Sequence, residues 1–504
     1  MKIKGKKMYP LNTRGKVAHF MAPVAASFVG MSMSMLMNFI TDYSGIDAAM
    51  GKAGYAVGFG TLFLLITRII DAVDDPVQGW LIDSSKESKF GKYRRFMVIG
   101  TFVLAVGGIM LYGMPTFVKA NPLLLWSWAI AGYLLYDMGS AMSNLTAPLI
   151  QKETTDANVR AKLSVYLRLA AVLASVPAMF YATIVTMIGK DGDLGRTATR
   201  VAVILIVVCC VIQLIGVALL KEPYREKASK EHFKPINFKE IGIIIKMKDF
   251  WVHIIGLFVG GMPYTLSAAV MLYYIRWGLC ADMATGEVDL VKFAALAGVY
   301  SLVALLPNFI APFFIPLILR TFKTVERAMY SCMLMIGGGY AAIFILNMLG
   351  VMKSFPYLLF VLYFLIMLPS GVSAQFGVLI TVECADYAEY ESGRNMTAFT
   401  TSIYNFINRV TTAVGAVIPG ALLIVVGYSV DSVTGAYAGN LADLPGMVNG
   451  LSVIMSLVPA ILGGLSFLIY KSGYKITPEF REQVTTELKR RHADEVNEDE
   501  EESK

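Results

Sequence analysis

The sequence has few charged residues and few of the residue types that build catalytic or metal centres. Only 16% of its 504 residues are charged, whereas 56% are hydrophobic and the mean hydropathy is +0.60. This composition is far too apolar for a soluble protein of this length. The five cysteines lie in or beside apolar runs without zinc-site spacing, so we expect small core residues, no disulfide framework and no bound metal centre. No nucleophile–base set is present, so neither an enzyme nor a cofactor is expected.

We also expect no cleavable leader. The first seven residues are basic, but the apolar run that follows is long and has no small-residue cleavage site. We therefore expect a retained first span. Apolar runs of the roughly 20 residues that cross a hydrocarbon core occur about twelve times, near 17–42, 53–82, 96–117, 122–150, 163–188, 199–220, 249–278, 291–319, 326–349, 355–384, 398–428 and 446–470.

A charged connection divides these spans into two sets of six. Residues 221–248 are rich in Lys and Glu and contain Pro223 and Pro235. We predict an all-α membrane protein of twelve transmembrane helices in two six-helix bundles, residues 1–220 and 249–471, with a central loop and a tail over 472–504. The acidic end of the tail is typical of a disordered segment.

Basic residues gather in the loops of one side. The N-terminus and the 2–3, 4–5, central and 8–9 loops carry Lys and Arg, and the opposite loops are poor in them. The positive-inside rule then places both termini in the cytoplasm. The 5–6 loop, with Lys190, Arg196 and Arg200, fits this assignment least well. We expect a multi-pass protein of the plasma membrane.

The second span carries a cluster of ionisable residues at membrane depth. Helical spacing puts Arg68, Asp71 and Asp75 on one side, with Asp74 and Gln78 beside them. Charges inside a span are costly and normally face a polar cavity that an ion or solute uses. Three carboxylates beside one arginine leave negative charge, which attracts a cation. The alternative is a structural salt-bridge cluster between helices.

Two motifs resemble one known transporter family. Arg68-x-x-Asp71-x-x-x-Asp75-Pro76 continues into Gly79-x-x-x-Asp83 and then KFGKYRR over 89–95, and a second marker, ECADYAEY, covers 383–390. Both resemble motifs of the glycoside-pentoside-hexuronide:cation symporters, a branch of the major facilitator superfamily, which has the same six-plus-six plan. The likeness covers nearly the whole chain and does not fix the solute.

The resemblance implies a cation site for Na⁺ or H⁺ on Asp71 and Asp75. Asp74 stands where a relative has asparagine, and mutual repulsion among carboxylates favours H⁺. Counting from the 4–5 loop places a further family aspartate on Ser143, next to Asn144. Either a neutral oxygen of Ser143 or Asn144 completes the cation site, or Asp137 completes it from nearly two helical turns earlier in the span. Asp137 is alternatively an interior residue paired with Arg168.

The same resemblance assigns residues to the solute and to coupling. Arg168 matches a sugar-contacting arginine, and Arg409 matches a lysine that links the cation and sugar sites; Arg68 is a second coupling candidate. A permanently charged guanidinium in place of a lysine is not a neutral change. Further candidates for solute contact are polar or aromatic groups that helix packing would equally explain: Asp137, Tyr136, Tyr404, Asn405 and Gln375.

The loop after the second span predicts a cytoplasmic gate. Charge pairs between Asp83 and the basic residues that follow it would hold the gate and break as the halves move. The alternative is an ordinary solvated basic loop. The candidate gate residues are Gly79, Asp83, Gly91, Lys92, Arg94, Arg95, Asp386 and Glu389.

These patterns predict a cation-coupled secondary transporter that imports a sugar or glycoside-like solute by alternating access. Its expected partners are a small polar solute, the coupling cation and the bilayer, not nucleic acid, and we expect a monomer. Two alternatives remain open: a carrier of a lysolipid or other amphipathic solute, and a receptor on the same fold that transports nothing. His253, alone on its span, is interpreted as a packed residue rather than a proton carrier.

Overall fold

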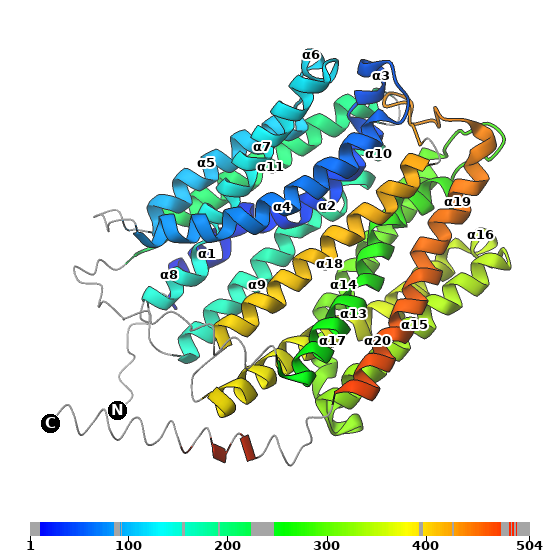
Figure 1. Cartoon of the computed structure of the whole chain (residues 1–504). Helices are drawn as coiled ribbons and strands as arrows, with labels where there is room; N and C mark the ends of the chain where they lie inside the picture. The colour runs from blue at the N-terminus through cyan, green and yellow to red at the C-terminus, as the bar shows by residue number, and fades with distance from the viewer. Residues whose placement is uncertain are drawn as a thin grey trace. The chain divides into compact units, whose positions relative to one another are not determined.

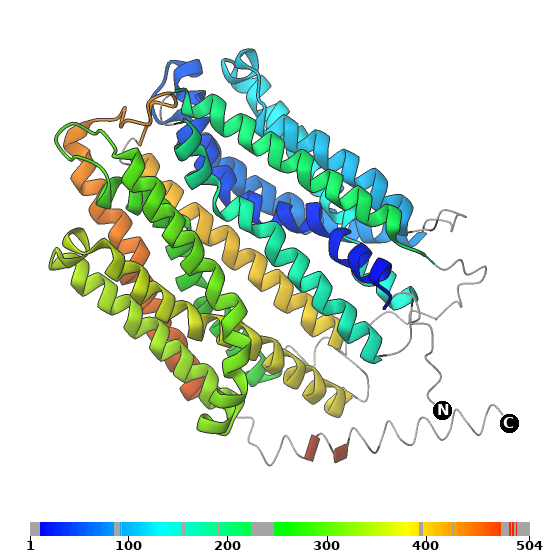
Figure 2. The ribbon, with the colours of Figure 1, turned by 180° about the vertical axis from the view of Figure 1, so that it is seen from behind.

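The computed structural model describes residues 11–84, 91, 93–153, 157–189, 192–222, 246–392, 397–425, 428–474 and five positions between 483 and 490. Figures 1 and 2 show these residues as long helices joined by short connections. Within the described residues, extended pairing is limited to two isolated β-bridges. The predicted all-α class is therefore confirmed.

The first half of the sequence forms twelve helical elements within the described residues. In chain order they are α1 (Thr13–Met21), α2 (Val24–Asn38), the π-helix η1 (Phe39–Tyr43), α3 (Ile46–Met50), α4 (Tyr55–Ser84), α5 (Tyr93–Tyr112), α6 (Thr116–Lys119), α7 (Pro122–Ser143), α8 (Thr146–Glu153), α9 (Ala157–Met179), α10 (Tyr181–Gly189) and α11 (Leu194–Leu219).

The second half continues with α13 (Lys248–Tyr274), the π-helix η2 (Ile275–Leu279), α14 (Leu290–Phe322), α15 (Val325–Met348), α16 (Val351–Ser354), α17 (Pro356–Ser392), α18 (Thr397–Val425), the 3₁₀ turn η3 (Leu441–Asp443), α19 (Leu444–Ser452), the π-helix η4 (Val453–Leu457) and α20 (Val458–Gly473). Local sequence sets several boundaries. Asn121 caps α7, with Pro122 at its first position, and the Asp193 and Thr324 side chains accept from the first turns of α11 and α15.

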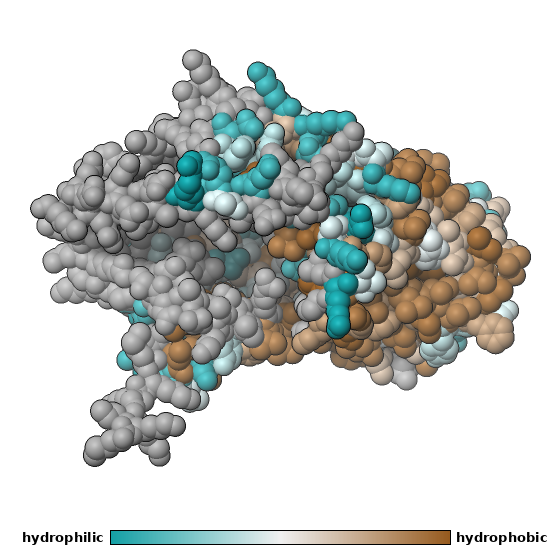
Figure 3. Space-filling view, turned by 90° about the horizontal axis from the view of Figure 1, so that it is seen from below, coloured by the Kyte–Doolittle hydropathy of each residue, from teal (hydrophilic) through white to brown (hydrophobic). Residues whose placement is uncertain are grey.

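Nine helices of the described residues are long and apolar enough to cross a membrane, and α1–α2–η1 forms a tenth span bent by 52°. Two helices with more polar content, α4 with 30 residues and α7 with 22, stand where the second and fourth spans are predicted. At 1.5 Å per residue each is long enough for a hydrocarbon core of about 30 Å. With the ten spans above, α4 and α7 occupy the twelve positions at which spans are predicted. Figure 3 shows hydrophobic side chains spread over the flank of the helices.

By their contacts the residues group into two compact units. Unit 1 comprises Met1–Lys230, Ile275–Gly298 and Gly420–Met447, and unit 2 comprises Glu231–Tyr274, Val299–Pro419 and Val448–Lys504. The bundle boundaries predicted from the sequence stay a prediction. Two segments from the second half of the chain, Ile275–Gly298 and Gly420–Met447, therefore belong to unit 1. Residues 223–245 of the central loop and most of the tail lie outside the described residues.

Small residues let the helices of each unit approach closely. In unit 1 a Cβ at Gly139 of α7 would lie 2.2 Å from the Leu104 nitrogen of α5, and one at Gly107 would lie 2.3 Å from the Tyr136 nitrogen. In unit 2 a Cβ at Gly463 of α20 would lie 2.7 Å from the Gly337 Cα of α15. Such contacts are the usual basis of helix packing in membranes, where burial gives little driving force.

The two ends of unit 1 differ in what they carry. At one end, here called the hairpin end, Lys119 Nζ donates to the Ser44 carbonyl (2.7 Å), and the Leu194 nitrogen donates to the Val433 carbonyl (3.3 Å). The label α6 marks this end in Figure 1. At the other, here called the basic end, Arg14 Nε donates to the Leu219 carbonyl (3.2 Å).

Candidate functional site

The Asp71 carboxylate on α4 is held by two neighbours inside unit 1. Tyr133 of α7 donates its phenolic hydrogen bond to Asp71 Oδ1, and Arg68 Nη1 lies 3.3 Å from Oδ2. The Asp71 and Arg68 side chains are only 13% and 26% exposed. These contacts hold the carboxylate in place while it remains partly open. It offers oxygen ligands to a cation.

Aromatic contacts fix how α4 and α7 lie against each other. Phe59 contacts Trp126 (ring centroids 4.8 Å), and Phe63 contacts Tyr133 (5.9 Å). Farther along α4, Asp71 accepts the hydrogen bond from Tyr133. Contacts therefore advance along both helices together, so the two run in the same direction. Asp137 lies one turn beyond Tyr133, half-buried and close enough to Tyr133 to act on it electrostatically. Asp137 is thus the fourth-span carboxylate that lies near Tyr133 and the Asp71 level.

The other fourth-span candidates occupy different surroundings. Ser143 is buried and its hydroxyl donates to the Ser140 carbonyl of its own helix (2.9 Å), while Asn144 is the exposed cap that ends α7. Ser143 is ten residues past Tyr133, about 15 Å along the helix axis. Tyr136 is fully buried, with its hydroxyl 2.5 Å from Ser32 Oγ of α2. The structure does not bring these three together with Asp71, and their predicted roles stay predictions.

Several predicted residues have side chains outside the described part of the structure. Their backbones, except that of Lys92, lie in described helices, so only their place in the chain is known. They are Asp74, Asp75, Gly79 and Asp83 on α4, Lys92 before α5, Arg168 on α9 and Asn405 on α18.

Unit 2 carries the remaining candidates for solute contact and coupling. Arg409 is exposed on α18. Tyr404, one turn earlier, is half-buried and packs toward α17, because a Cβ at Gly377 would lie 3.7 Å from its ring. Gln375 is half-buried on α17. Their contact with a solute, and the role of Arg409 in linking the solute and cation sites, stay predictions.

Gly91 does have a specific structural role at the basic end of unit 1. Its φ is +98°, and a Cβ there would lie 2.2 Å from the Glu222 carboxylate. That carboxylate accepts from the backbone nitrogens of Tyr93 (3.3 Å) and Arg94 (3.0 Å) at the start of α5, and Arg94 Nε donates to the Val217 carbonyl (3.3 Å). Glu222 therefore caps α5. The sequence signal that could have identified Glu222 is the basic first turn of α5, which has no capping side chain of its own.

The other gate candidates with described side chains make different contacts. The Arg95 guanidinium sits over the adjacent Phe96 ring at 5.3 Å. On α17 in unit 2, Asp386 is half-buried and Glu389 is 7% exposed. Nearby, Glu383 accepts from the Tyr474 hydroxyl (3.1 Å). The charge pairs predicted for Asp83 and Lys92 lie outside the described side chains.

His253 is a packed residue, as the sequence predicts. It is fully buried on α13, with Nε2 2.9 Å from Thr381 Oγ1 and Nδ1 3.1 Å from the Tyr470 hydroxyl. Both ring nitrogens therefore have partners within unit 2.

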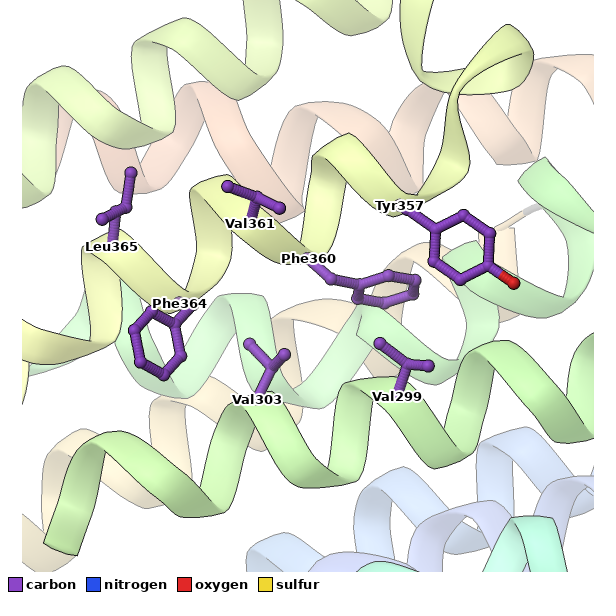
Figure 4. A pocket seen from close by; sticks show the side chains of 7 residues that line it. All are labelled: Val299, Val303, Tyr357, Phe360, Val361, Phe364 and Leu365. Carbon is purple, nitrogen blue, oxygen red and sulfur yellow. The ribbon is translucent and has the colours of Figure 1, made fainter. Parts of the chain in front are cut away.

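An apolar groove of about 310 Å³ opens between α14 and α17 of unit 2 (Figure 4). Valine, phenylalanine and leucine side chains line it, with Tyr357 at one end and Val361 and Leu365 largely exposed. A sugar site needs several hydrogen-bonding groups. This groove therefore does not fit a sugar.

The membrane-spanning helices of the described residues, with ionisable groups held among them, define a polytopic membrane protein. The sequence matches the family described as "MFS/sugar transport protein" over residues 18–478, and the chain belongs to that family. The resemblance seen in the motifs and the predicted fold class are thereby confirmed.

Named relatives and a solved structure agree with this assignment. The chain is 24% identical to "Uncharacterized symporter YjmB" of Bacillus subtilis (strain 168), covering 90% of each chain. It is also 24% identical to "Isoprimeverose transporter" of Lactiplantibacillus pentosus, covering 91% of this chain and 88% of the relative. A solved D-xylose-proton symporter shares the fold with a TM-score of 0.56 at 12% identity, covering 90% of this chain and 98% of that one.

Proposed function

We propose that the protein is a symporter that uses a cation gradient to import a sugar or glycoside by alternating access. The observation that carries this is the Asp71 carboxylate held by Tyr133 and Arg68 inside the bundle of a sugar-transport family member. Relatives named as a symporter and as an isoprimeverose transporter support it. The amphipathic-solute and receptor alternatives are not favoured by these names.

The coupling ion is assigned to α4 and α7. Asp71 supplies one carboxylate, Asp75 follows one helical turn later, and Asp137 stands one turn beyond Tyr133 on α7. Asp75 lies one turn after Asp71, and Asp137 lies one turn after Tyr133. Because α4 and α7 run in the same direction, Asp75 and Asp137 are therefore at similar depth along the two helices. The extra carboxylate of Asp74 favours H⁺ over Na⁺. Asp137 is preferred here to Ser143 or Asn144 as the third contributor.

The solute is assigned to polar groups of both halves. Arg168 and Arg409 would hold hydroxyl oxygens with their guanidinium donors, and the Tyr404 ring would cover an apolar sugar face. Asn405 and Gln375 would complete the hydrogen bonds. Cation binding would lower the repulsion among the carboxylates and so favour solute binding, and the solute would favour the cation to the same extent.

We assign the basic end of unit 1 to the cytoplasm and the hairpin end to the outside of the plasma membrane. The basic end carries α1 and the start of α5, and the sequence beside both is rich in Lys and Arg. Both termini then lie in the cytoplasm, and a monomer suffices because each chain holds all the assigned residues.

Solute-evoked ion movement tests the proposal and identifies the ion. Cells expressing the protein would receive pentosides, hexuronides, glucosides and galactosides in turn, with an external pH electrode and a Na⁺ electrode recording ion uptake. We expect one of these solutes to evoke uptake of H⁺ or Na⁺ that cells without the protein do not show. Evoked uptake only by lysolipid analogues would favour the amphipathic carrier, and binding without any flux would favour the receptor.

A further inference from the structure

A buried ion pair lies at the hairpin end of unit 1, away from the Asp71 site. Arg276 Nη1 is 2.6 Å from Asp42 Oδ2, and the two side chains are 2% and 1% exposed. The residues are 234 positions apart in the sequence. A buried pair of opposite charges is stable only with close geometry and additional hydrogen bonds, and this one has both.

Further polar groups complete the pair. The Tyr428 hydroxyl donates to Asp42 Oδ1 (2.9 Å) and accepts from Trp277 Nε1 (3.0 Å), and Asn38 Nδ2 donates to Asp42 Oδ2 (3.2 Å). Arg276 Nη2 donates to a backbone carbonyl of a neighbouring loop, at residue 435 (2.7 Å). Asp42, Arg276 and their hydrogen-bond partners Tyr428 and Trp277 are called the polar latch below.

Both charged residues stand in irregular backbone. Asp42 belongs to the π-helix η1 at the end of the first span, and Arg276 belongs to the π-helix η2 at the end of the seventh. π-Helical turns are rare and frequently mark functional positions. The corresponding first spans of the two halves of the chain therefore carry the two partners of one ion pair.

Two matching hairpins of the second half attach to this end. Residues 281–288 and 430–437 each close with one antiparallel bridge and share the pattern Asp-x-x-Thr-Gly. In each, the glycine nitrogen donates to the aspartate carbonyl, Gly286 to Asp282 (2.9 Å) and Gly435 to Asp431 (2.7 Å). Both glycines have positive φ, 71° and 76°. The hairpins are joined because the Tyr437 nitrogen donates to the Gly286 carbonyl (3.0 Å).

The second hairpin also bonds to residues of the first half. Ser429 Oγ donates to Asp47 Oδ2 (2.6 Å), and the Gly195 nitrogen donates to the Ser432 carbonyl (2.9 Å). In Figure 1 the orange loop before α19 lies beside α3 accordingly. The polar latch and the hairpins together close this end of unit 1.

We propose that the polar latch is a releasable closure of the hairpin end, and that it opens when the transporter admits solute from that side. This inference rests on the proposed transport function. A permanent wall would be built equally well from apolar side chains. Carboxylate, guanidinium, phenol and indole groups can instead exchange each internal hydrogen bond for one to water, so the open arrangement is also tolerated.

Cys280 provides a native reporter of opening. It directly follows η2, is 6% exposed and is a free thiol. Burial raises the pKa of the Cys280 thiol to about 12, with nearby Asp289 adding to this and Lys292 opposing it. A maleimide reacts with the thiolate, so a buried thiol with a raised pKa is labelled far more slowly than an exposed one. Opening of the end therefore increases labelling of Cys280.

The test is the maleimide labelling rate of Cys280 in protein reconstituted in lipid nanodiscs, measured by peptide mass spectrometry. Both faces are accessible there, and neither solute nor ion gradient is needed, so failure of this inference is distinguishable from failure of the transport proposal. The Asp42→Asn variant leaves the buried Arg276 without its charged partner. We expect it to raise the labelling rate of Cys280 at least about tenfold. Asp42→Asn with Arg276→Gln, which removes both charges, should give a smaller rise than Asp42→Asn alone.

The matched control is Arg196→Gln, which removes an exposed ion pair with Asp193 at the same end and should leave the Cys280 rate unchanged. Tyr428→Phe keeps both charges and should raise the rate by a smaller factor. An unfolded variant would label all five cysteines together, whereas an opened latch exposes Cys280 alone. Wild-type rates in both Asp42→Asn and Tyr428→Phe would overturn the inference.

Discussion

The Tyr133 phenol of α7 donates its hydrogen bond to the Asp71 carboxylate of α4, and this contact joins the second and fourth spans at the level of the acidic cluster. Because Arg68 approaches the other oxygen of the same carboxylate, Asp71 has a fixed position and a defined charge balance. The proposed cation site is organised by these two contacts.

Replacing Tyr133 by phenylalanine should change ion affinity without changing the fold. A hydrogen bond to a charged group contributes about 1.5 kcal/mol or more, and here it occupies a carboxylate oxygen that would otherwise bind the ion. We expect the ion concentration that gives half-maximal solute uptake to fall by roughly tenfold. Tyr181→Phe is the matched control because the buried Tyr181 hydroxyl donates to the Ala198 carbonyl instead. Equal shifts in both variants would remove Tyr133 from the site.

Asp74→Asn should change the choice of ion. Removing one carboxylate from a cluster of three lowers mutual repulsion and with it the preference for a proton. We expect solute uptake in the variant to depend less on a pH gradient and more on a Na⁺ gradient. Initial rates of uptake under each imposed gradient measure this. An unchanged preference would place Asp74 outside the cation cluster.

Arg409→Gln should separate solute movement from ion movement. A coupling residue that exchanges charge partners during transport is needed for accumulation but not for exchange of solute for solute. We expect the variant to retain exchange and lose accumulation, and Arg409→Lys to retain both. Arg320→Gln removes another exposed arginine of unit 2 and serves as the control. Loss of exchange and accumulation together would indicate a general structural role for Arg409.

Gly139→Ala should destabilise unit 1. The added methyl would lie 2.2 Å from the Leu104 nitrogen of α5, and backbone cannot move aside cheaply. Overpacking of this kind typically costs about 1–3 kcal/mol, so a clear fall in thermal melting temperature in detergent is expected. Gly338→Ala, where a Cβ would have nothing within 4 Å, should be neutral or slightly stabilising. Equal melting temperatures for the two variants would contradict the close packing of α5 and α7.

The twelve spans could be predicted because hydrocarbon thickness fixes the length and composition of every membrane helix. The acidic cluster of α4 could be predicted for the same reason, since Asp71 is costly in a span unless it has a polar partner. The partner itself could not be identified in the same way. Tyr133 is an ordinary aromatic residue of an apolar run, and only its spacing of one turn from Asp137 hinted that it shares that face.

The latch at the hairpin end was not predicted for a different physical reason. Asp42 and Arg276 stand at the ends of predicted spans, where charged residues normally meet water, and a linear sequence does not pair residues that far apart. A readable signal did exist in the repeated Asp-x-x-Thr-Gly pattern that ends at Gly286 and Gly435. Two loops with the same turn chemistry indicate equivalent structures in the two places.

The most direct test of cation-coupled import is accumulation of the labelled solute in vesicles under an imposed inward H⁺ or Na⁺ gradient. The wild-type protein should concentrate the solute above the external level and lose that ability when an ionophore collapses the gradient. Asp71→Asn and Asp75→Asn, folded as judged by their melting temperatures, should only equilibrate it. Full accumulation in both variants, or wild-type accumulation that ignores both gradients, would contradict the account.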